Sequence, residues 1–193
     1  MNDFLARTQE GAAALRRAVS DISAQPQLIA SVRENPAVGA GILAGIIAQV
    51  EKARTLTRPS ALGVAALTAN HAAYAWGLYR RGARNDALGW GLRVAAWGAG
   101  VAATRSQPTS AAVAVGGAAV LATSALAGDP VLRTDAGKGI GHGANLLVAA
   151  EALTALRAAL KQRKHKARLV RAAETGALVI GHLLLIDGLH RTR

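Results

Sequence analysis

The sequence predicts an all-α fold, namely a small polytopic helical membrane protein with about four to six transmembrane helices. Residues 60–79 form the longest stretch without Asp, Glu, Lys or Arg, and about 20 apolar-leaning residues in a helix span the hydrocarbon of a bilayer. This stretch ends at Trp76 and Tyr79, directly before Arg80 and Arg81. Aromatic rings followed by guanidinium groups are typical of a membrane interface. Several similar runs follow, so we expect a multi-pass protein.

The composition agrees with this interpretation and leaves one alternative open. Of the 193 residues, 51% are hydrophobic but only 3% are aromatic, so the apolar content is mainly Ala, Val, Leu and Gly. Small residues let membrane helices approach one another closely, whereas a soluble core needs larger side chains to fill its volume. The mean hydropathy of +0.23 favours a membrane protein. An Ala-rich soluble helical bundle remains the alternative.

Charge and cysteine content restrict the partners and the chemistry. A net charge of +12 predicts an anionic partner, which is either lipid headgroups, an acidic protein or nucleic acid. The sequence contains no cysteine, which excludes disulfides, thiolate metal sites and a cysteine nucleophile. Asp3, Arg7 and Glu10 interrupt the apolar stretch that a secretory signal requires, so no signal is expected.

The chain divides into two segments by pattern. Residues 1–34 form an amphipathic N-terminal helical segment, either a cap packed on the domain or a helix lying on a membrane surface. Residues 35–193 form the helical membrane domain. Its apolar runs are 36–50, 60–79, 87–103, 110–128, 139–156 and 169–189.

Small residues in the first run predict close helix packing. Asn35 is the predicted N-cap of a helix, and Pro36 is its predicted first residue, a position that proline favours. Gly41 and Gly45 then follow in the GxxxG spacing of packed membrane helices. The same small-residue faces are where we expect a homo-oligomer to form.

One charged residue lies inside the third run. Arg93 shares a helix face with Trp90, three positions before it, and with Trp97, four positions after it. A guanidinium between two indoles can form an anion or headgroup site through cation–π contacts. The alternative, which we favour, is an arginine that extends to the membrane interface.

A basic loop is predicted at residues 157–168, before the last run. Its cations are Arg157, Lys161, Arg163, Lys164, Lys166 and Arg168. They are expected either to bind anionic lipid headgroups or an acidic protein, or only to set the topology. If run 139–156 stays on one face of the membrane, five spans remain and the positive charges collect on one side, so charge favours five.

Candidate chemistry in the sequence is sparse. The glycine-rich segment 128–143 lacks the Ser or Thr after Gly137 and Lys138 that a phosphate-binding loop needs, so we interpret it as a linker entering a helix. No metal-ligand spacing is present, and neither a metal nor a cofactor is expected. Ionisable residues within apolar runs indicate function by default, but the interpretation that we favour is that they are interfacial residues or interhelical hydrogen-bond partners. The candidates are Glu151, Glu174, His182 and Asp187.

Two short motifs resemble a known family. RTLTRP, at residues 54–59, is similar to the segment before the second helix of the lysoplasmalogenase-like membrane hydrolases, and His71 to Tyr74 resembles their HxxY segment. The resemblance implies a hydrolase that uses two aspartates, one of them after a glycine. At that position this chain has Gly98 and Ala99, and the second aspartate has no equivalent.

The sequence therefore favours an integral membrane protein with a structural, lipid-interacting or partner-interacting role rather than a catalytic one. A membrane-embedded enzyme or transporter is the first alternative, and a soluble basic helical protein that binds nucleic acid is the second. Nucleic acid is disfavoured because the basic segment 157–168 has no aromatic residue for base stacking. The expected location is the plasma membrane in a bacterium, with an organelle membrane left open.

Overall fold

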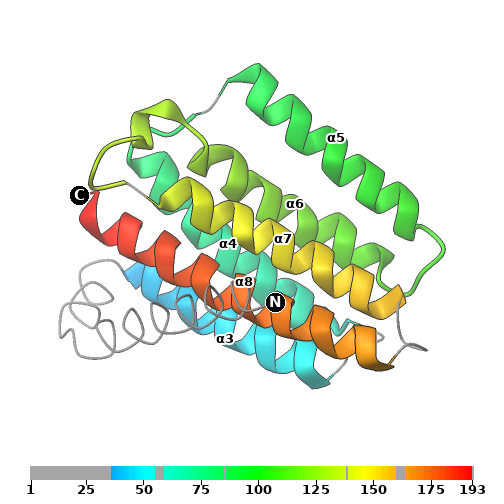
Figure 1. Ribbon diagram of the computed structural model, residues 1–193. Helices are drawn as coiled ribbons and strands as arrows, with labels where there is room; N and C mark the ends of the chain where they lie inside the picture. Colours follow the sequence, from blue (N-terminus) through cyan, green and yellow to red (C-terminus); the bar gives the residue numbers. More distant parts are fainter. Residues whose placement is uncertain (1–35, 55–58, 85, 138, 160–163, 193) are drawn as a thin grey trace, which may run out of the picture. The chain divides into compact units, whose positions relative to one another are not determined.

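The described part of the chain is entirely helical. The computed structural model describes residues 36–54, 59–84, 86–137, 139–159 and 164–192, with side chains outside 157–168, and no strand occurs there (Figure 1). The elements are α3 (Pro36–Arg54), α4 (Ala61–Arg80), α5 (Ala87–Thr104), α6 (Ser110–Ala127), the 3₁₀ helix η1 (Pro130–Leu132), α7 (Ile140–Ala159) and α8 (Lys164–Arg191). The all-α prediction is confirmed. The amphipathic segment predicted at 1–34 lies outside the described residues.

Local sequence sets where three of these helices begin. Pro36 is the first residue of α3, where its missing N–H costs nothing and its fixed φ suits the helix. The Ser60 hydroxyl caps α4 by accepting a hydrogen bond of 2.9 Å from the backbone N–H of Gly63. The Asp86 carboxylate caps α5 in the same way, at 2.6 Å from the N–H of Gly89. Each helix therefore starts at a residue suited to a helix N-terminus.

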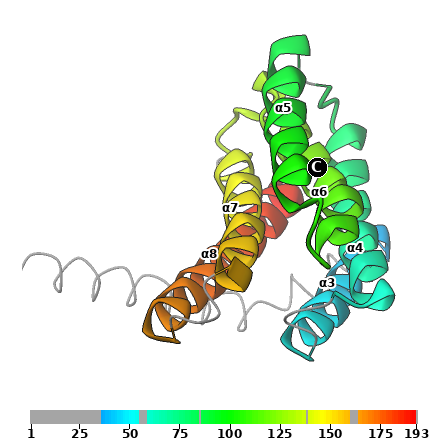
Figure 2. The same cartoon turned by 90° about the vertical axis from the view of Figure 1, so that its right-hand side faces the viewer.

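The helices lie side by side, and neighbours in the sequence run in opposite directions (Figures 1 and 2). α6 contacts α4, α5 and α7, while α7 packs along α8. One end of the bundle, here called the Arg81 end, gathers the C-terminal ends of α4, α6 and α8. There the Arg81 guanidinium donates to the Leu189 carbonyl, and the Arg84 N–H donates to Asp129 at 2.6 Å. The opposite end, with the C-terminal ends of α3, α5 and α7, is called the Lys52 end.

Glycines allow neighbouring helices to approach closely. A Cβ atom placed on Gly143 of α7 would lie 2.7 Å from the carbonyl oxygen of Gly181 on α8. A Cβ atom on Gly116 of α6 would lie 2.9 Å from a methyl group of Leu67 on α4. At Gly143 the nearest atoms belong to the backbone of α8, and at Gly116 they belong to the Leu67 side chain, so a larger residue at either position would push the helices apart.

Gly41 and Gly45 pack α3 against α4 within one molecule. A Cβ atom on Gly41 would lie 2.5 Å from the Cβ of Ala73, and one on Gly45 would lie 2.9 Å from the amide nitrogen of Asn70. That Asn70 amide donates a hydrogen bond of 2.7 Å to the Gly41 carbonyl. The GxxxG spacing thus has an intramolecular partner, and the homo-oligomer through small-residue faces stays a prediction.

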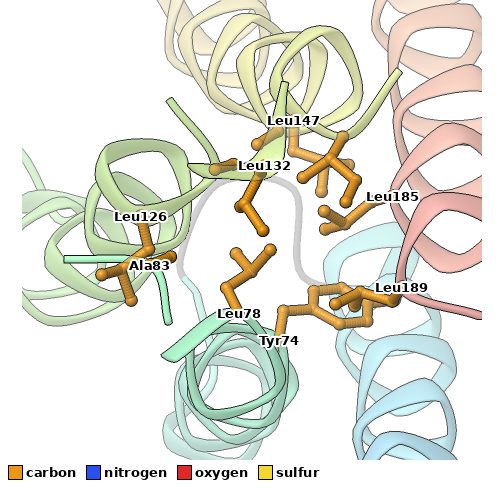
Figure 3. Close-up of a cluster of buried hydrophobic side chains, with 11 residues drawn as sticks. Tyr74, Leu78, Ala83, Leu126, Leu132, Leu147, Leu185 and Leu189 are labelled. Carbon is orange, nitrogen blue, oxygen red and sulfur yellow. The ribbon is translucent and has the colours of Figure 1, made fainter. Parts of the chain in front are cut away.

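The main apolar cluster lies toward the Arg81 end, where α4, α6, α7 and α8 meet (Figure 3). Tyr74 and Leu78 of α4 face Leu185 and Leu189 of α8, all nearly inaccessible to solvent. Leu132 of η1 points into the same cluster and closes it. Each fully buried leucine stabilises the fold by about 1.5–3 kcal/mol, so this end is held mainly by apolar burial.

Two described helices are long and apolar enough to cross a membrane, by length and composition. They are Ser110–Ala127, with a mean hydropathy of 1.8, and Leu169–Arg191, with 1.6. Ile140–Leu156 is a shorter apolar helix. The expected four to six spans are therefore not confirmed by this measure. The reason is that Ala-rich helices lose apolar character with each polar residue, such as His71 in α4 or Arg93 in α5.

Gly143→Ala should lower stability by about 1–3 kcal/mol, because the new methyl group meets backbone atoms of Gly181 and Leu185 that cannot rotate away. Gly176→Ala in α8 is the matched control, since a Cβ there meets nothing within 4 Å. It should be neutral or stabilising by up to about 1 kcal/mol. Thermal loss of helical circular dichroism measures both. Equal stability of the two variants would contradict the close α7–α8 contact.

Candidate functional site

Two of the four polar residues singled out in the sequence meet in one charged cluster at the Lys52 end. The Lys52 ammonium lies 2.8 Å from a carboxylate oxygen of Glu151 and 3.6 Å from one of Glu174. The Thr154 hydroxyl donates a hydrogen bond of 2.8 Å to the same Glu174 oxygen. The side chains of Lys52, Glu151 and Glu174 are only 19%, 25% and 8% exposed. This cluster joins α3, α7 and α8.

His182 and Asp187 do not take part in that cluster. The His182 Nδ1 atom lies 2.9 Å from the Tyr74 hydroxyl, which links α8 to α4. Asp187 lies at the Arg81 end, where it is partly exposed and forms an ion pair with Arg191 one helical turn later. The four residues considered from the sequence therefore occupy three separate environments.

Further polar contacts join the helices through the interior. The His71 Nδ1 atom of α4 lies 3.1 Å from the Thr123 hydroxyl of α6, and that hydroxyl donates to the His71 carbonyl at 3.0 Å. The Ser124 hydroxyl of α6 donates to the side-chain carbonyl of Asn145 on α7 at 2.8 Å. These bonds give buried polar side chains partners on neighbouring helices.

Arg93 joins α5 to α6. Its guanidinium donates to the Ser124 hydroxyl at 3.1 Å and to the Gly89 carbonyl at 2.9 Å. The Trp97 indole N–H donates to the Val113 carbonyl at 3.2 Å. Hydrogen bonds to α6 thus position both side chains. The two interpretations of Arg93 from the sequence, an anion site between indoles and an arginine that extends to the membrane interface, stay predictions.

A pocket of about 460 Å³ lies between α3, α4, α5, α6 and α7 at the Lys52 end. Lys52 and Glu151 line it near the helix ends, together with Thr104. Leu67 and Leu121 line it farther along the helices. The volume falls within the range of small-molecule sites, and a mostly apolar lining with a few polar groups is typical of them.

The basic segment differs in form from the predicted loop. α7 continues to Ala159 and α8 begins at Lys164, so both flanks of 157–168 are helical. The side chains of Arg157, Lys161, Arg163, Lys164, Lys166 and Arg168 lie outside the described residues. Their binding of anionic lipid or an acidic partner therefore stays a prediction.

Lys52 is the residue of this site that the sequence analysis did not identify. It lies in the last turn of α3, in a polar stretch that resembles an ordinary helix end. The available signal is the presence of Glu151 and Glu174 within apolar runs, because buried carboxylates require a cationic or hydrogen-bonding partner. That requirement does not say which of the 23 lysines and arginines supplies the charge.

Comparisons with known proteins do not assign a function to this site. The chain matches no protein-family model, no curated protein and no solved structure. The resemblance to lysoplasmalogenase-like hydrolases is thus not supported by a family match, and His71 and Tyr74, which carry part of it, are buried between helices. Among the described residues, no group of His, Asp or Glu side chains could hold a metal ion.

Lys52→Met should destabilise the fold by about 1–4 kcal/mol, because it removes the ammonium from two largely buried carboxylates. Arg54→Met is the control. Arg54 is 72% exposed and 3.7 Å from Glu51, so its loss should cost less than about 0.5 kcal/mol. Adding Glu151→Gln to Lys52→Met should recover part of the loss, a non-additivity that a double-mutant cycle of unfolding free energies measures. Equal effects of Lys52→Met and Arg54→Met would contradict the buried cluster.

Proposed function

We propose that this chain is a multi-pass integral membrane protein with a structural or lipid- and partner-binding role rather than a catalytic one. The observation that carries the proposal is the distribution of polarity in the described helices. Large apolar side chains face outward, while several polar side chains are buried and bonded to one another. Buried leucines form the apolar cluster near the Arg81 end, and it is the exposed apolar surface outside that cluster that is unfavourable in water and suited to a hydrocarbon environment.

Large apolar side chains are exposed along α3 and α5 in particular. On α3, Leu43 is 64% exposed and Ile46 is 56% exposed. On α5, Leu88 and Leu92 are 70% and 65% exposed, and Thr104 is the buried residue of that helix. Soluble monomers rarely expose contiguous apolar patches of this kind, which mark protein or membrane contacts. Lipid chains around α3 and α5 would remove the free-energy cost of exposing these apolar side chains to water.

The buried polar residues support the same proposal from the inside. They are Asn70, His71, Thr104, Thr123, Ser124 and Glu174. Each takes part in a hydrogen bond described above or, for Thr104, in a bond of 2.9 Å to the Gly100 carbonyl. In a bilayer no water is present to satisfy such groups, so polar side chains must find partners within the protein.

The end of α4 has the features of a membrane interface. Trp76 and Tyr79 are exposed and stacked, with ring centroids 5.9 Å apart. The Arg80 guanidinium lies 6.0 Å from the Trp76 ring, and that of Arg84 lies 3.7 Å from the Tyr79 ring. Amphipathic rings paired with cations are favoured at the level of the headgroups, which supports placing the Arg81 end there.

We propose six crossings, one for each described helix. A helix of 18 residues is about 27 Å long, close to the hydrocarbon thickness of ~30 Å. The antiparallel packing of α7 along α8 supports six crossings rather than the five that charge favours, because α7 then lies along the bundle axis like the other helices and not on one face of the membrane. An even number of crossings puts the start of α3 and the end of α8 on the same side.

The proposed partners are anionic lipid headgroups or an acidic protein, which the basic segment 157–168 would meet at the membrane surface. The proposed membrane is the plasma membrane in a bacterium, and an organelle membrane otherwise. What supports a non-catalytic role is that Glu151 and Glu174 are engaged with Lys52 and Thr154, as structural ion pairs are.

The full-length chain should stay in the membrane pellet after alkaline carbonate extraction and require detergent for its release. The reason is that the outward faces of α3 and α5 would lie in lipid. Immunoblotting of pellet and supernatant measures this. Recovery of a monodisperse, cooperatively melting protein in plain buffer would contradict the proposal and favour the soluble alternative.

Cysteines introduced at the two ends of α6 should be labelled from opposite sides of the membrane. The natural chain has no cysteine, so Ser106→Cys in the α5–α6 turn and Asp135→Cys after η1 each provide one exposed thiol. An impermeant maleimide added to sealed cells or vesicles should label one variant, and the other only after permeabilisation. Labelling of both from the same side would contradict a crossing by α6.

A further inference from the structure

The pocket at the Lys52 end changes in polarity along its length. Near the helix ends its lining includes Gln49, Ser60 and Thr109, beside the Lys52–Glu151 ion pair. Farther along the same helices the lining is apolar. This gradient matches an amphiphile, which has a polar head and an apolar chain. The apolar part offers few partners to ordered water.

The pocket is accessible from the α5 side of the bundle. Ala96 and Ala103 of α5 line the pocket and are themselves exposed. In the proposed membrane arrangement this side faces lipid, so a lipid chain reaches the pocket laterally without passing through water. The inference therefore rests on the proposed membrane embedding, since the bilayer supplies the ligand.

Charge at the Lys52 end favours an anionic head group. From Glu151 to Glu174 the sequence contains seven lysines and arginines and only these two acidic residues. This stretch connects α7 to α8, whose ends at Ala159 and Lys164 lie at the Lys52 end. Basic residues at a membrane surface each favour an anionic lipid, so the charge of this connection favours an anionic headgroup there.

We propose that the pocket binds one acyl chain of an anionic phospholipid from the surrounding bilayer, with the lipid headgroup at the Lys52 end. The chain lies between α5 and the wall formed by α4 and α6, against Leu67 and Trp97. Burial of its methylene groups in this lining stabilises the complex, and the positive charge at this end selects the headgroup.

Trp97 provides the measurement, because it lines the pocket and Trp76 and Trp90 do not. Replacing Trp76 and Trp90 by Phe leaves Trp97 as the single tryptophan. This protein is reconstituted into phosphatidylcholine vesicles that contain a rising mole fraction of phosphatidylglycerol with brominated chains. Parallel vesicles contain brominated phosphatidylcholine instead. At low mole fraction the brominated anionic lipid should quench Trp97 with an apparent affinity about fivefold higher than that of brominated phosphatidylcholine.

Two leucine substitutions on α5 test whether the pocket is responsible. Gly100 lines the pocket, and a Cβ there would lie 3.7 Å from Val113, an ordinary contact that α5 tolerates. Gly100→Leu should fill the site and weaken the selective quenching about tenfold, the loss of roughly two buried methylene groups. Gly98 does not line the pocket and faces open space, so Gly98→Leu should leave the quenching unchanged.

Retained selectivity in Gly98→Leu together with its loss in Gly100→Leu supports the proposal. Equal quenching by the two brominated lipids at every mole fraction would overturn the anionic assignment. Selectivity that survives Gly100→Leu would place the lipid at the basic surface and overturn the pocket. Carbonate extraction of the same vesicles reads out embedding separately, so a failure of lipid binding is distinguishable from a failure of the proposed function.

Discussion

The contact of the Lys52 ammonium with Glu151 and Glu174 is the interaction on which the Lys52 end depends. It connects residues 99 positions apart in the sequence and holds α3 against α7 and α8. α3 is also attached to α4 through glycine contacts, the Asn70 amide hydrogen bond and a hydrogen bond of 2.6 Å from the Ser60 hydroxyl to Glu51. A buried ion pair is a modest source of stability, but removal of one partner is costly, so charged and polar contacts fix the position of α3 together with close backbone packing.

The Ala- and Gly-rich composition gives the bundle two unlike ends. Close backbone approach, as at Gly143 and Gly181, substitutes for the large side chains that a soluble core uses. Leucines collect near the Arg81 end, where Leu78, Leu132 and Leu185 fill the space between helices. The Lys52 end lacks such volume, and its helices leave a pocket instead. Where small residues cannot fill the interior, polar contacts set the spacing and cavities remain.

The helix positions were predictable from the sequence, because apolar runs and capping residues are local properties. The final helix is the exception, because it begins at Lys164 and not near residue 169. The predicted run was bounded by its apolar residues, and this criterion leaves out lysines and arginines although they are good helix formers. The Lys52 cluster was not predictable, because which cation meets Glu151 depends on tertiary packing. The number of membrane-spanning helices was not predictable either. Alanine contributes almost nothing to the free energy of membrane insertion, so Ala-rich helices give little signal.

The weak attachment of α5 connects the membrane proposal to the pocket. α5 buries little of itself, and it is tied to α6 by hydrogen bonds from Arg93 and Trp97. Such bonds contribute only about 1 kcal/mol each, and because Leu88 and Leu92 stay exposed, α5 gains little from the hydrophobic effect by packing on α6 in water. In lipid those leucines carry no penalty, and the same bonds suffice to hold the helix. Since α5 forms one wall of the pocket, the pocket is stable in the environment that also supplies its proposed ligand.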